Sequence, residues 1–378
     1  MLVVVTNIPT PYRTAFFNTL QQELLRVGQS LHVLYCAKTE TGRYWQFDPE
    51  ENHYPFSFLK GWHPEFKGYY PHINFELIIH LKKLKPNWIM AAGSWNAPAT
   101  ITLLLNKKKL NCPIIFWSEG HFDAQVRSNK YIDYLRRTIL KKLDYFVVPN
   151  LKSKEYILHY NRNAVVEFLP NTVDESFFSL SINDSKVQIR TSKGLPLDKT
   201  ILVLVSSLDT RKGVLDFYDA FKEAKRDSLY VVQIGTGEFY ETLKKRIATD
   251  NLAKYYRLTG QLVPKEVREY LIAADVFVLP TKSDPNPLSP IEASFLKKTL
   301  LVSSKAGNAK DLIVDGENGW IMKEINNEEL MKNINIIANT KKEVLEMMGE
   351  KSFDIVSNSF TRKKASENLI IFLNKIKN

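Results

Sequence analysis

The chain has 378 residues, of which 44% are hydrophobic and 25% charged, and its formal net charge is +11. These proportions are typical of globular proteins and exclude a disordered, collagenous or disulfide-scaffold chain. At roughly 150 residues per domain, the length predicts two domains. Cys36 and Cys112 lie beside apolar runs, so we expect buried free thiols and a reducing, cytoplasmic compartment.

Short apolar runs alternate with helical patterns, which is typical of parallel sheets wound with helices. The first series of predicted strands comprises residues 2–6, 31–36, 88–92, 114–117 and 145–148, with helices at 13–25 and 75–84. The second series comprises strands at 201–205, 230–234, 276–279 and 299–302, with helices at 213–224, 239–249 and 264–273. The longest apolar run is far below the ~20 residues of a membrane span, and the first residues are typical of a strand rather than of a secretion signal.

Each series predicts one doubly wound, Rossmann-like domain of the α/β class. We expect an N-terminal domain at 1–175, a linker at 176–198, a C-terminal domain at 199–360 and a terminal helix at 361–378 that packs back on the N-terminal domain. The linker is predicted because its residues lack periodicity and are rich in Ser, Asp, Lys and Pro. Ligands of such sheets bind beyond the carboxyl ends of the strands, so two domains that face each other would form a cleft lined by loops from both.

Positive charge is concentrated between Lys107 and Lys142, where one helical pattern is both basic and amphipathic. Its apolar positions are Ile132, Leu135, Ile139 and Leu143, and its basic positions are Arg136, Arg137, Lys141 and Lys142. Two interpretations stay open. The segment is either a solvated surface helix or a patch for a membrane surface or an acidic ligand.

Motifs for several kinds of chemistry are missing from the sequence. There is no D-x-D, H-x-x-x-H or C-x-x-C pattern, so nothing has the spacing of a dedicated metal site. The G-x-S-x-G elbow of serine hydrolases and the phosphate-binding pattern G-x-x-x-x-G-K-[ST] are also missing. We therefore expect a metal-independent protein with no cofactor.

Two strand-to-helix loops of the second series favour anion binding. Arg211 and Lys212 stand just before a helix, where their charge opposes the helix dipole by ~0.3–1 kcal/mol unless an anion binds between them. The alternative is an exposed turn with solvated charges. Gly235 and Gly237 form a tight turn after the next strand, which lets the backbone approach a ligand closely.

A third loop carries Asp284 and Glu292, two carboxylates that are eight residues apart after a predicted strand. Residues 289–292 read Ser-Pro-Ile-Glu, which is the pattern of a capping box with proline at the first helical position. In that interpretation Glu292 has a structural role at the helix start. The two roles are compatible, because a capping carboxylate can also bind a ligand.

Taken in order, these loops resemble those of the retaining nucleotide-sugar glycosyltransferases of family 4, which have the two-lobed GT-B fold. The resemblance is strongest over the second series of strands. It implies that Lys212 binds the leaving diphosphate, that Asp284 lies near the donor sugar's hydroxyls and that Glu292 holds the ribose hydroxyls. The family's basic residue before this lysine is replaced by Ser207, and Arg211 is expected to supply the missing charge.

The resemblance also implies roles for residues of both domains. In the first series, His121 occupies the position at which many members place a histidine near the reacting sugar, and an interdomain structural role is the alternative. Further donor-binding positions are Gly235, Gly237, Leu288 and Ser289, the last two through their backbone amides. The acceptor-side positions are Pro11, Tyr12 and Glu119, in loops that follow predicted strands.

The implied reaction moves a glycosyl group from a nucleoside diphosphate sugar to a glycan or lipid-linked acceptor with retention of configuration, in surface polysaccharide or glycoconjugate biosynthesis. The enzyme would be of the hexosyltransferase type and would need no metal. Its expected partners are the donor, the acceptor and the anionic inner face of the membrane, without nucleic acid. Two alternatives stay open: a non-catalytic basic protein that binds nucleic acid or anionic membrane, and a nucleotide-sugar epimerase or hydrolase on the same fold.

Overall fold

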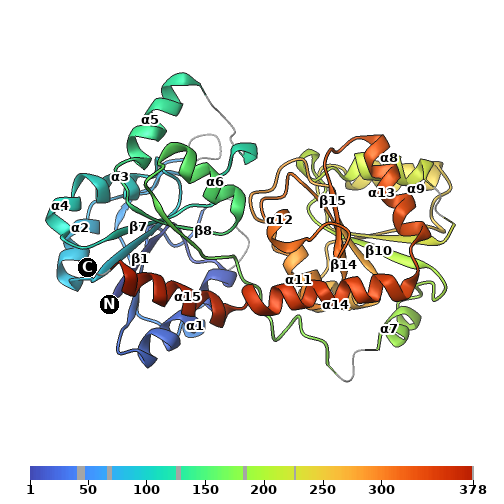
Figure 1. Cartoon of the computed structure of the whole chain (residues 1–378), viewed down its shortest axis with the longest axis horizontal. Coiled ribbons are helices and arrows are strands. Elements are labelled where there is room, and N and C mark those ends of the chain that lie inside the picture. Colours follow the sequence, from blue (N-terminus) through green and yellow to red (C-terminus); the bar gives the residue numbers. More distant parts are fainter. Residues whose placement is uncertain (41–46, 66–69, 125–128, 182–184, 225–226, 377–378) are drawn as a thin grey trace. The chain divides into compact units, whose positions relative to one another are not determined.

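The computed structural model describes residues 1–40, 47–65, 70–124, 129–181, 185–224 and 227–376. The chain divides into two compact units, which Figure 1 colours along the sequence. The N-terminal unit comprises Met1–Asp174 and Thr361–Asn378, and the C-terminal unit comprises Glu175–Phe360. Within the described ranges, no helix is both long enough and apolar enough to cross a bilayer.

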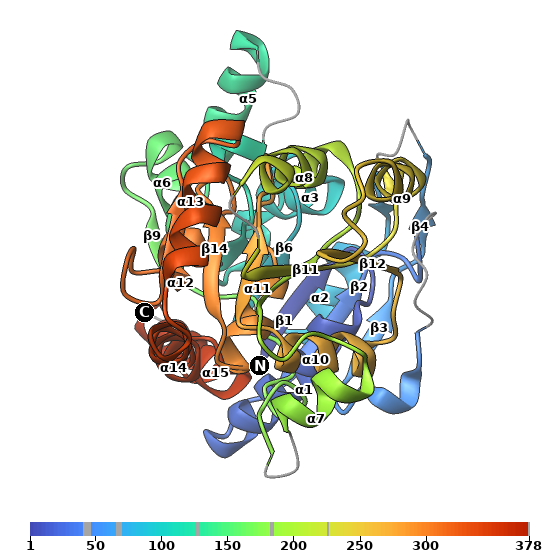
Figure 2. The same cartoon turned by 90° about the vertical axis from the view of Figure 1, so that its right-hand side faces the viewer.

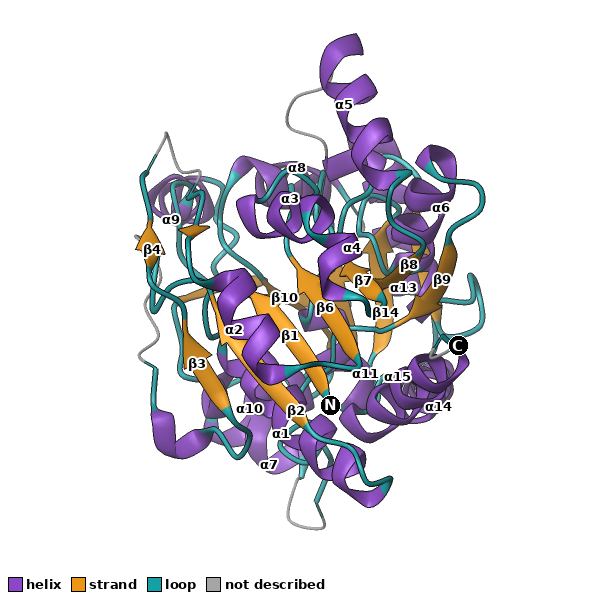
Figure 3. Cartoon of the chain, turned by 90° about the vertical axis from the view of Figure 1, so that its left-hand side faces the viewer, coloured by secondary structure: helices purple, strands orange, loops and turns teal. Residues whose placement is uncertain are grey.

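A seven-stranded parallel sheet forms the centre of the N-terminal unit, in the order β3-β2-β1-β6-β7-β8-β9 (Figure 3). Side chains alternate between the two faces of a strand, so Leu2 and Val4 join one core while Val3 and Val5 join the other. All four are buried, which explains the continuous apolar run. The strands are β1 (Leu2–Thr6), β2 (Leu31–Tyr35), β3 (Phe56–Phe58), β6 (Trp88–Ala92), β7 (Ile114–Trp117), β8 (Tyr145–Val148) and β9 (Val165–Phe168), beside a hairpin of β4 (Gly61–Trp62) and β5 (Ile73–Asn74).

Helices cover both faces of this sheet. One face packs against α1 (Pro11–Arg26) and α15 (Arg362–Lys375), which lie side by side (Figure 1). Phe372 of α15 and Phe17 of α1 belong to the same buried cluster, so the last helix completes the N-terminal core. The other face packs against α2 (Leu77–Leu84), α3 (Pro98–Leu105), α5 (Lys130–Leu140) and α6 (Leu151–Tyr160), and the remaining helical turns are η1 (Pro49–Glu51), α4 (Lys107–Leu110) and η2 (Phe122–Ala124).

The C-terminal unit is built on a six-stranded parallel sheet, in the order β12-β11-β10-β13-β14-β15. Figure 2 labels β11, β12 and β14 of this sheet. Two doubly wound Rossmann-like domains are therefore present, as predicted. The strands are β10 (Thr200–Val205), β11 (Leu229–Ile234), β12 (Tyr256–Gly260), β13 (Val276–Leu279), β14 (Thr299–Ser303) and β15 (Gly319–Met322). The helices are α8 (Val214–Glu223), α9 (Tyr240–Thr249), α10 (Pro264–Ala273), α11 (Ser289–Phe295), α12 (Ala309–Leu312), α13 (Asn327–Asn339) and α14 (Lys342–Ser359), with a short turn η3 (Thr210–Lys212).

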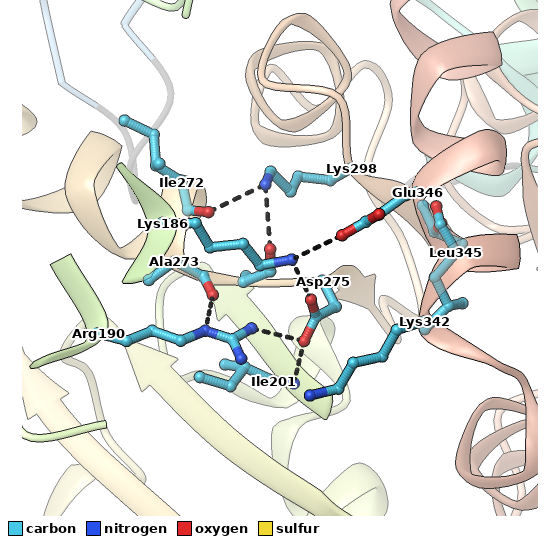
Figure 4. Close-up of polar contacts among 12 residues, drawn as sticks. Lys186, Arg190, Ile201, Ile272, Ala273, Asp275, Lys298, Lys342, Leu345 and Glu346 are labelled. Atoms are coloured by element: carbon cyan, nitrogen blue, oxygen red, sulfur yellow. Dashed lines mark hydrogen bonds and ion pairs between the residues drawn. The ribbon is translucent and has the colours of Figure 1, made fainter. Parts of the chain in front are cut away.

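The stretch 176–198, expected as a linker, contains a helix, α7 (Lys186–Ser192), and belongs to the C-terminal unit. Arg190 Nη2 donates to Asp275 Oδ2 at 2.7 Å, and Lys186 pairs with the same carboxylate (Figure 4). Burial would raise the pKa of Asp275, but the charges of Lys186 and Arg190 outweigh burial and lower it. Because this carboxylate also accepts from the Ile201 amide at 2.7 Å, it fixes α7 to the starts of β10 and β13.

Lys298, directly before β14, lies beside this cluster and is only 6% exposed. Its Nζ donates to the carbonyl oxygens of Ile272 at 3.1 Å and Ala274 at 3.0 Å (Figure 4). In the part of the chain that the structure describes, no carboxylate lies within ion-pair distance of this amine. Burial, helped by the nearby charge of Lys186, lowers the pKa of Lys298 to about 7.

This lowered pKa predicts a stability that depends on pH. An unfolded lysine has a pKa of about 10.4, so between pH 7 and about 10 the unfolded chain binds a proton that the folded chain does not. The contribution of Lys298 to the free energy of unfolding should therefore rise with pH across this window, and Lys298→Met should remove the rise. Urea unfolding of both proteins from about pH 6 to about pH 9 measures it. A constant difference in stability between them would contradict the prediction.

Candidate active site

The loops at the carboxyl edge of the C-terminal sheet are held together by close backbone contacts. A Cβ atom on Gly235 would lie 1.9 Å from the carbonyl oxygen of Ser206, and one on Gly237 would lie 2.6 Å from that of Leu208. Both glycines also have positive φ, at 133° and 155°. The glycine turn after β11 therefore packs directly on the loop after β10, and no larger residue fits at either position.

An ion pair joins the loop after β10 to the loop after β13, its neighbour in the sheet. Lys212 Nζ pairs with Asp284 Oδ2, and each side chain is 14% exposed. The two residues are far apart in the sequence, yet both were predicted site residues. The structure brings them into direct contact at the carboxyl ends of two parallel strands, where ligands of such sheets bind.

Backbone contacts on either side of Lys212 fix this ion pair in place. The carbonyl oxygen of Arg211 accepts from the Lys282 amide at 2.6 Å and from Thr281 Oγ1 at 2.9 Å. Gly213, with φ +63°, approaches the carbonyl of Pro280 so closely that a Cβ atom would lie 2.0 Å from its oxygen. These contacts hold the backbone on both sides of Lys212 and so limit the positions that its ammonium group can take.

Asp284 is in turn tied to the loop after β14. Its carbonyl oxygen accepts from the Gly307 amide at 2.8 Å, and its Oδ1 accepts from the Asn286 amide at 3.3 Å. Asn308, which is fully buried, donates from Nδ2 to the Pro287 carbonyl at 2.8 Å. Asn286 and Asn308 were not predicted as site residues. The sequence feature that could have indicated Asn308 is its position directly after Gly307 in a strand-to-helix loop.

Glu292 lies in α11, which begins at Ser289, but the predicted capping box is wrong. The N-cap position is Leu288, which makes no side-chain hydrogen bond, and Ser289 and Pro290 occupy the first two helical positions. The carboxyl group of Glu292 is hydrogen-bonded to none of the described residues. Burial raises its pKa to about 7. A desolvated carboxyl group without a partner is ready to accept hydrogen bonds from a ligand.

The guanidinium group of Arg211 pairs with Asp209, at a distance from the ammonium group that the sequence expected it to assist. Its guanidinium Nη2 lies 3.1 Å from Asp209 Oδ2, and its side chain is 62% exposed. Asp209 also accepts from Ser207 Oγ at 2.8 Å and from the Arg211 amide at 2.9 Å, which caps η3. Arg211 therefore stands at the rim of the site with its charge paired, and replacement of the family's basic residue stays a prediction.

In the N-terminal unit, Glu119 is connected to an arginine that was not predicted as a site residue. Arg13 Nη2 lies 3.4 Å from Glu119 Oε1, and Nη1 donates to Thr6 Oγ1 at 2.8 Å. The guanidinium carbon lies 4.8 Å from the ring centre of Trp117. Arg13 lies in the first turn of the helix that follows the first strand, at the carboxyl edge of the N-terminal sheet. A basic residue at this position is the sequence feature that could have indicated it.

The other predicted residues of this unit lie at the same edge. Pro11 and Tyr12 begin α1 directly after the loop that follows β1, with Pro11 exposed and Tyr12 half-buried. His121 follows β7 and is 1% exposed. Each of the two units carries part of the predicted site. Over the described ranges, no group of three or more His, Cys, Asp or Glu side chains could hold a metal ion.

Residues 185–354 match the family model described as glycosyl transferases group 1. This segment is nearly the whole C-terminal unit. Two solved structures share the fold of the full chain: Anabaena Alr3699/HepE in complex with UDP, with TM-score 0.76 and 15% identity, and the lipopolysaccharide outer core galactosyltransferase WaaB in its apo form, with TM-score 0.71 and 12% identity. Each comparison covers 99% of both chains. The predicted GT-B fold is confirmed.

Among curated proteins, the chain is 33% identical over 147 residues to the putative teichuronic acid biosynthesis glycosyltransferase TuaC of Bacillus subtilis, across 37% of this chain and 36% of that protein. It is 29% identical over 201 residues to the UDP-Gal:alpha-D-GlcNAc-diphosphoundecaprenol alpha-1,3-galactosyltransferase of Escherichia coli, across 52% and 50%. The chain thus spans about a third to a half of the length of these relatives.

The close approach at Gly213 predicts a large effect of a single methyl group. Gly213→Ala should destabilise the protein by about 2 kcal/mol or more, because it adds a backbone clash to the strain of a positive φ. Gly316→Ala is the matched control, since Gly316 has φ +82° but open space around its Cβ position. It should cost only the conformational strain, about 1 kcal/mol. Equal losses in a thermal unfolding experiment would contradict the prediction.

Proposed function

We propose that the protein is a retaining glycosyltransferase that transfers a hexosyl group from a nucleoside diphosphate sugar to a glycan or lipid-linked acceptor, in surface polysaccharide or glycoconjugate biosynthesis. The observation that carries the proposal is the Lys212–Asp284 ion pair, which lies in the segment that matches the group 1 glycosyl transferase model. Retention is proposed from the resemblance of these loops to those of family 4. The free cysteines Cys36 and Cys112 support a cytoplasmic site of action.

In the proposed mechanism, Lys212 stabilises the charge that develops on the leaving diphosphate. The ammonium group is largely shielded from water, so its interaction with a phosphate oxygen would be stronger than in solvent. It supplies the positive charge that a divalent cation would otherwise provide, and we therefore propose that no metal is needed. The diphosphate oxygen that leaves would take the proton of the acceptor hydroxyl, which attacks from the same face of the sugar.

Asp284 and Glu292 would bind the two ends of the donor. The diphosphate competes with Asp284 for Lys212, so donor binding would release this carboxylate to accept from a sugar hydroxyl. Glu292 would accept from the ribose hydroxyls, and the amides of Leu288 and Ser289 would donate to the sugar and phosphate. The structure of HepE with UDP makes a uridine nucleotide the first donor to test.

The acceptor would bind at the carboxyl edge of the N-terminal sheet. Glu119, held by Arg13, is a hydrogen-bond acceptor for a sugar hydroxyl, and Pro11 and Tyr12 supply a surface on which a sugar ring can pack. His121, which follows Glu119 closely in the sequence, is buried. We propose that it lies near the reacting sugar.

Variants of the ion pair test the function. Lys212→Ala should lower turnover of the nucleotide sugar about 10²–10³-fold and weaken nucleotide binding, because it removes the charge that stabilises the leaving group. Asp284→Asn should lower turnover but strengthen binding of the free nucleoside diphosphate, because the competing carboxylate is gone. Product formation from UDP, GDP and ADP sugars and calorimetry with the nucleotides measure both effects. Asp216→Asn, which breaks the partly exposed Lys282–Asp216 pair between the first turn of α8 and the loop after β13, is the matched control.

Full activity of Lys212→Ala would overturn the transferase proposal. Weaker nucleotide binding by Asp284→Asn would overturn only the competition between carboxylate and diphosphate. Loss of activity in the Asp216→Asn control would show that any disturbance near the start of α8 and the loop after β13 has the same effect.

The raised pKa of Glu292 predicts that nucleotide binding depends on pH. Hydroxyl donors stabilise the carboxylate, so binding should lower the pKa of Glu292 from about 7 and release a proton. Nucleotide affinity should therefore increase as the pH rises through 7. Glu292→Gln cannot titrate and should show only the titration of the nucleotide's own phosphate. Identical pH profiles for the two proteins, measured by calorimetry, would contradict the assignment.

A further inference from the structure

A cavity lies at the amino edge of the C-terminal sheet, where the strands begin, opposite the edge that carries the candidate active site. It has a volume of about 220 Å³ and is lined in part by Asp275 and Lys298, which directly precede β13 and β14. The apolar part of its wall comes from Leu180, Ile272, Leu296 and Leu345. The proposed transfer reaction uses none of these residues.

The amine of Lys298 makes two hydrogen bonds, which is the number of N–H groups that a neutral amine can donate. Its Nζ donates to the carbonyl oxygens of Ile272 at 3.1 Å and Ala274 at 3.0 Å (Figure 4). An ammonium group has a third N–H, and within the described ranges no third acceptor lies at hydrogen-bond distance. These contacts therefore suit the neutral amine, which keeps a lone pair free to act as a nucleophile.

The carboxylate of Asp275, drawn near Lys298 in Figure 4, is committed to other partners. It pairs with Lys186 and Arg190 and accepts from the Ile201 amide at 2.7 Å. The side chains of Asp275 and Arg190 are each 4% exposed, and that of Lys186 is 30% exposed. Two cations with one carboxylate leave an excess of positive charge beside Lys298, which disfavours another ammonium group and favours an anion there.

Water screens the other carboxylates around the cavity. Glu346, which lies 3.9 Å from Lys186 Nζ, is 68% exposed, and Glu350, which pairs with Lys297 at 2.8 Å, is 57% exposed. Charges at such exposure act more weakly than charges in the interior. Burial and the charge of Lys186 together lower the pKa of Lys298 to about 7, so about half of this amine is neutral at neutral pH.

We propose that Lys298 reacts reversibly with carbon dioxide to form a lysine carbamate. The lone pair of Nζ forms a bond to the carbon of CO₂, the electron pair of one C=O bond moves onto its oxygen, and one N–H proton leaves to solvent. The products are R–NH–COO⁻ and H⁺, so the step needs no leaving group, oxidant or reductant. The remaining N–H can keep one of the two carbonyl contacts, and the excess positive charge of Lys186 and Arg190 stabilises the new carboxylate.

Carbon dioxide is the electrophile that the cavity favours. Lys298 is only 6% exposed, so a bulky acyl donor cannot reach its amine, whereas a three-atom apolar molecule can enter a cavity with a partly apolar wall. CO₂ reacts with neutral amines, and a lysine of ordinary pKa is neutral at pH 7 in fewer than about one molecule in 10³. The reaction is therefore expected at Lys298 and not at exposed lysines. The inference does not depend on the transferase proposal.

Chemical trapping on the full, folded chain tests the inference. The protein is incubated at about pH 7.5 with ¹³C-bicarbonate in equilibrium with CO₂, treated with triethyloxonium to ethylate any carbamate, and mapped by peptide mass spectrometry. Lys298 should carry at least about ten-fold more label than any exposed lysine. Peptide mapping separates this label from that on the α-amino group, which also reacts. Absence of label from Lys298, or equal labelling of Lys297, would overturn the proposal whether or not any variant folds.

Variants at the two adjacent lysines supply the controls. Lys298→Arg keeps a cation with N–H donors but forms no carbamate, and it should lose the label. Lys297→Arg, which can keep the pair with Glu350, is the matched control and should retain the label. Because CO₂ reacts with Lys298 only in the folded chain, it should raise the unfolding temperature of the original chain above that in sodium chloride of equal ionic strength. An equal rise in folded Lys298→Arg would contradict the assignment.

Discussion

The ion pair between Lys212 and Asp284 is the contact on which the candidate active site depends. It links the loops after β10 and β13, and further contacts extend this link to the glycine turn after β11 and to the loop after β14. Four strand ends of one sheet are thereby fixed around a single ammonium group. Because the pair is mostly shielded from solvent, neither partner can be removed without leaving a desolvated charge. In the proposed function, the same constraint holds the lysine where a phosphate would replace the carboxylate.

The sequence predicted the centre of each sheet and missed the edges. All nine predicted strands are present, whereas the outermost strands β3, β9, β12 and β15 were not foreseen. A central strand is covered on both faces and reads as an unbroken apolar run, as in β1 and β10. An edge strand is partly exposed, and all three residues of β3 are half-buried. Its residues therefore lack a clear apolar pattern, and pairing with a neighbour defines it.

The sequence indicated only those residues of the candidate site whose side chains are charged and can take part in the chemistry. A lysine and two carboxylates in or directly after strand-to-helix loops were the signal for Lys212, Asp284 and Glu292, whose roles stay a prediction. The support for these residues was not predictable, because hydrogen bonds such as that of Asn308 to a carbonyl depend on loops that are distant in sequence. The orientation of α5, in which Arg136 is buried, was missed for a related reason. Periodicity treats arginine as polar, whereas in the fold Arg136 meets a carboxylate and aromatic rings that compensate its burial.

The position of α15 sets the order in which the chain can fold during synthesis. This helix contributes Leu369, Phe372 and Leu373 to the core of the N-terminal unit, but it leaves the ribosome only after the whole C-terminal unit has been made. The C-terminal unit is continuous in sequence and can close its own core first. Until translation reaches α15, one face of the first sheet has only α1 to cover it. A chaperone that protects the nascent chain would meet that apolar face.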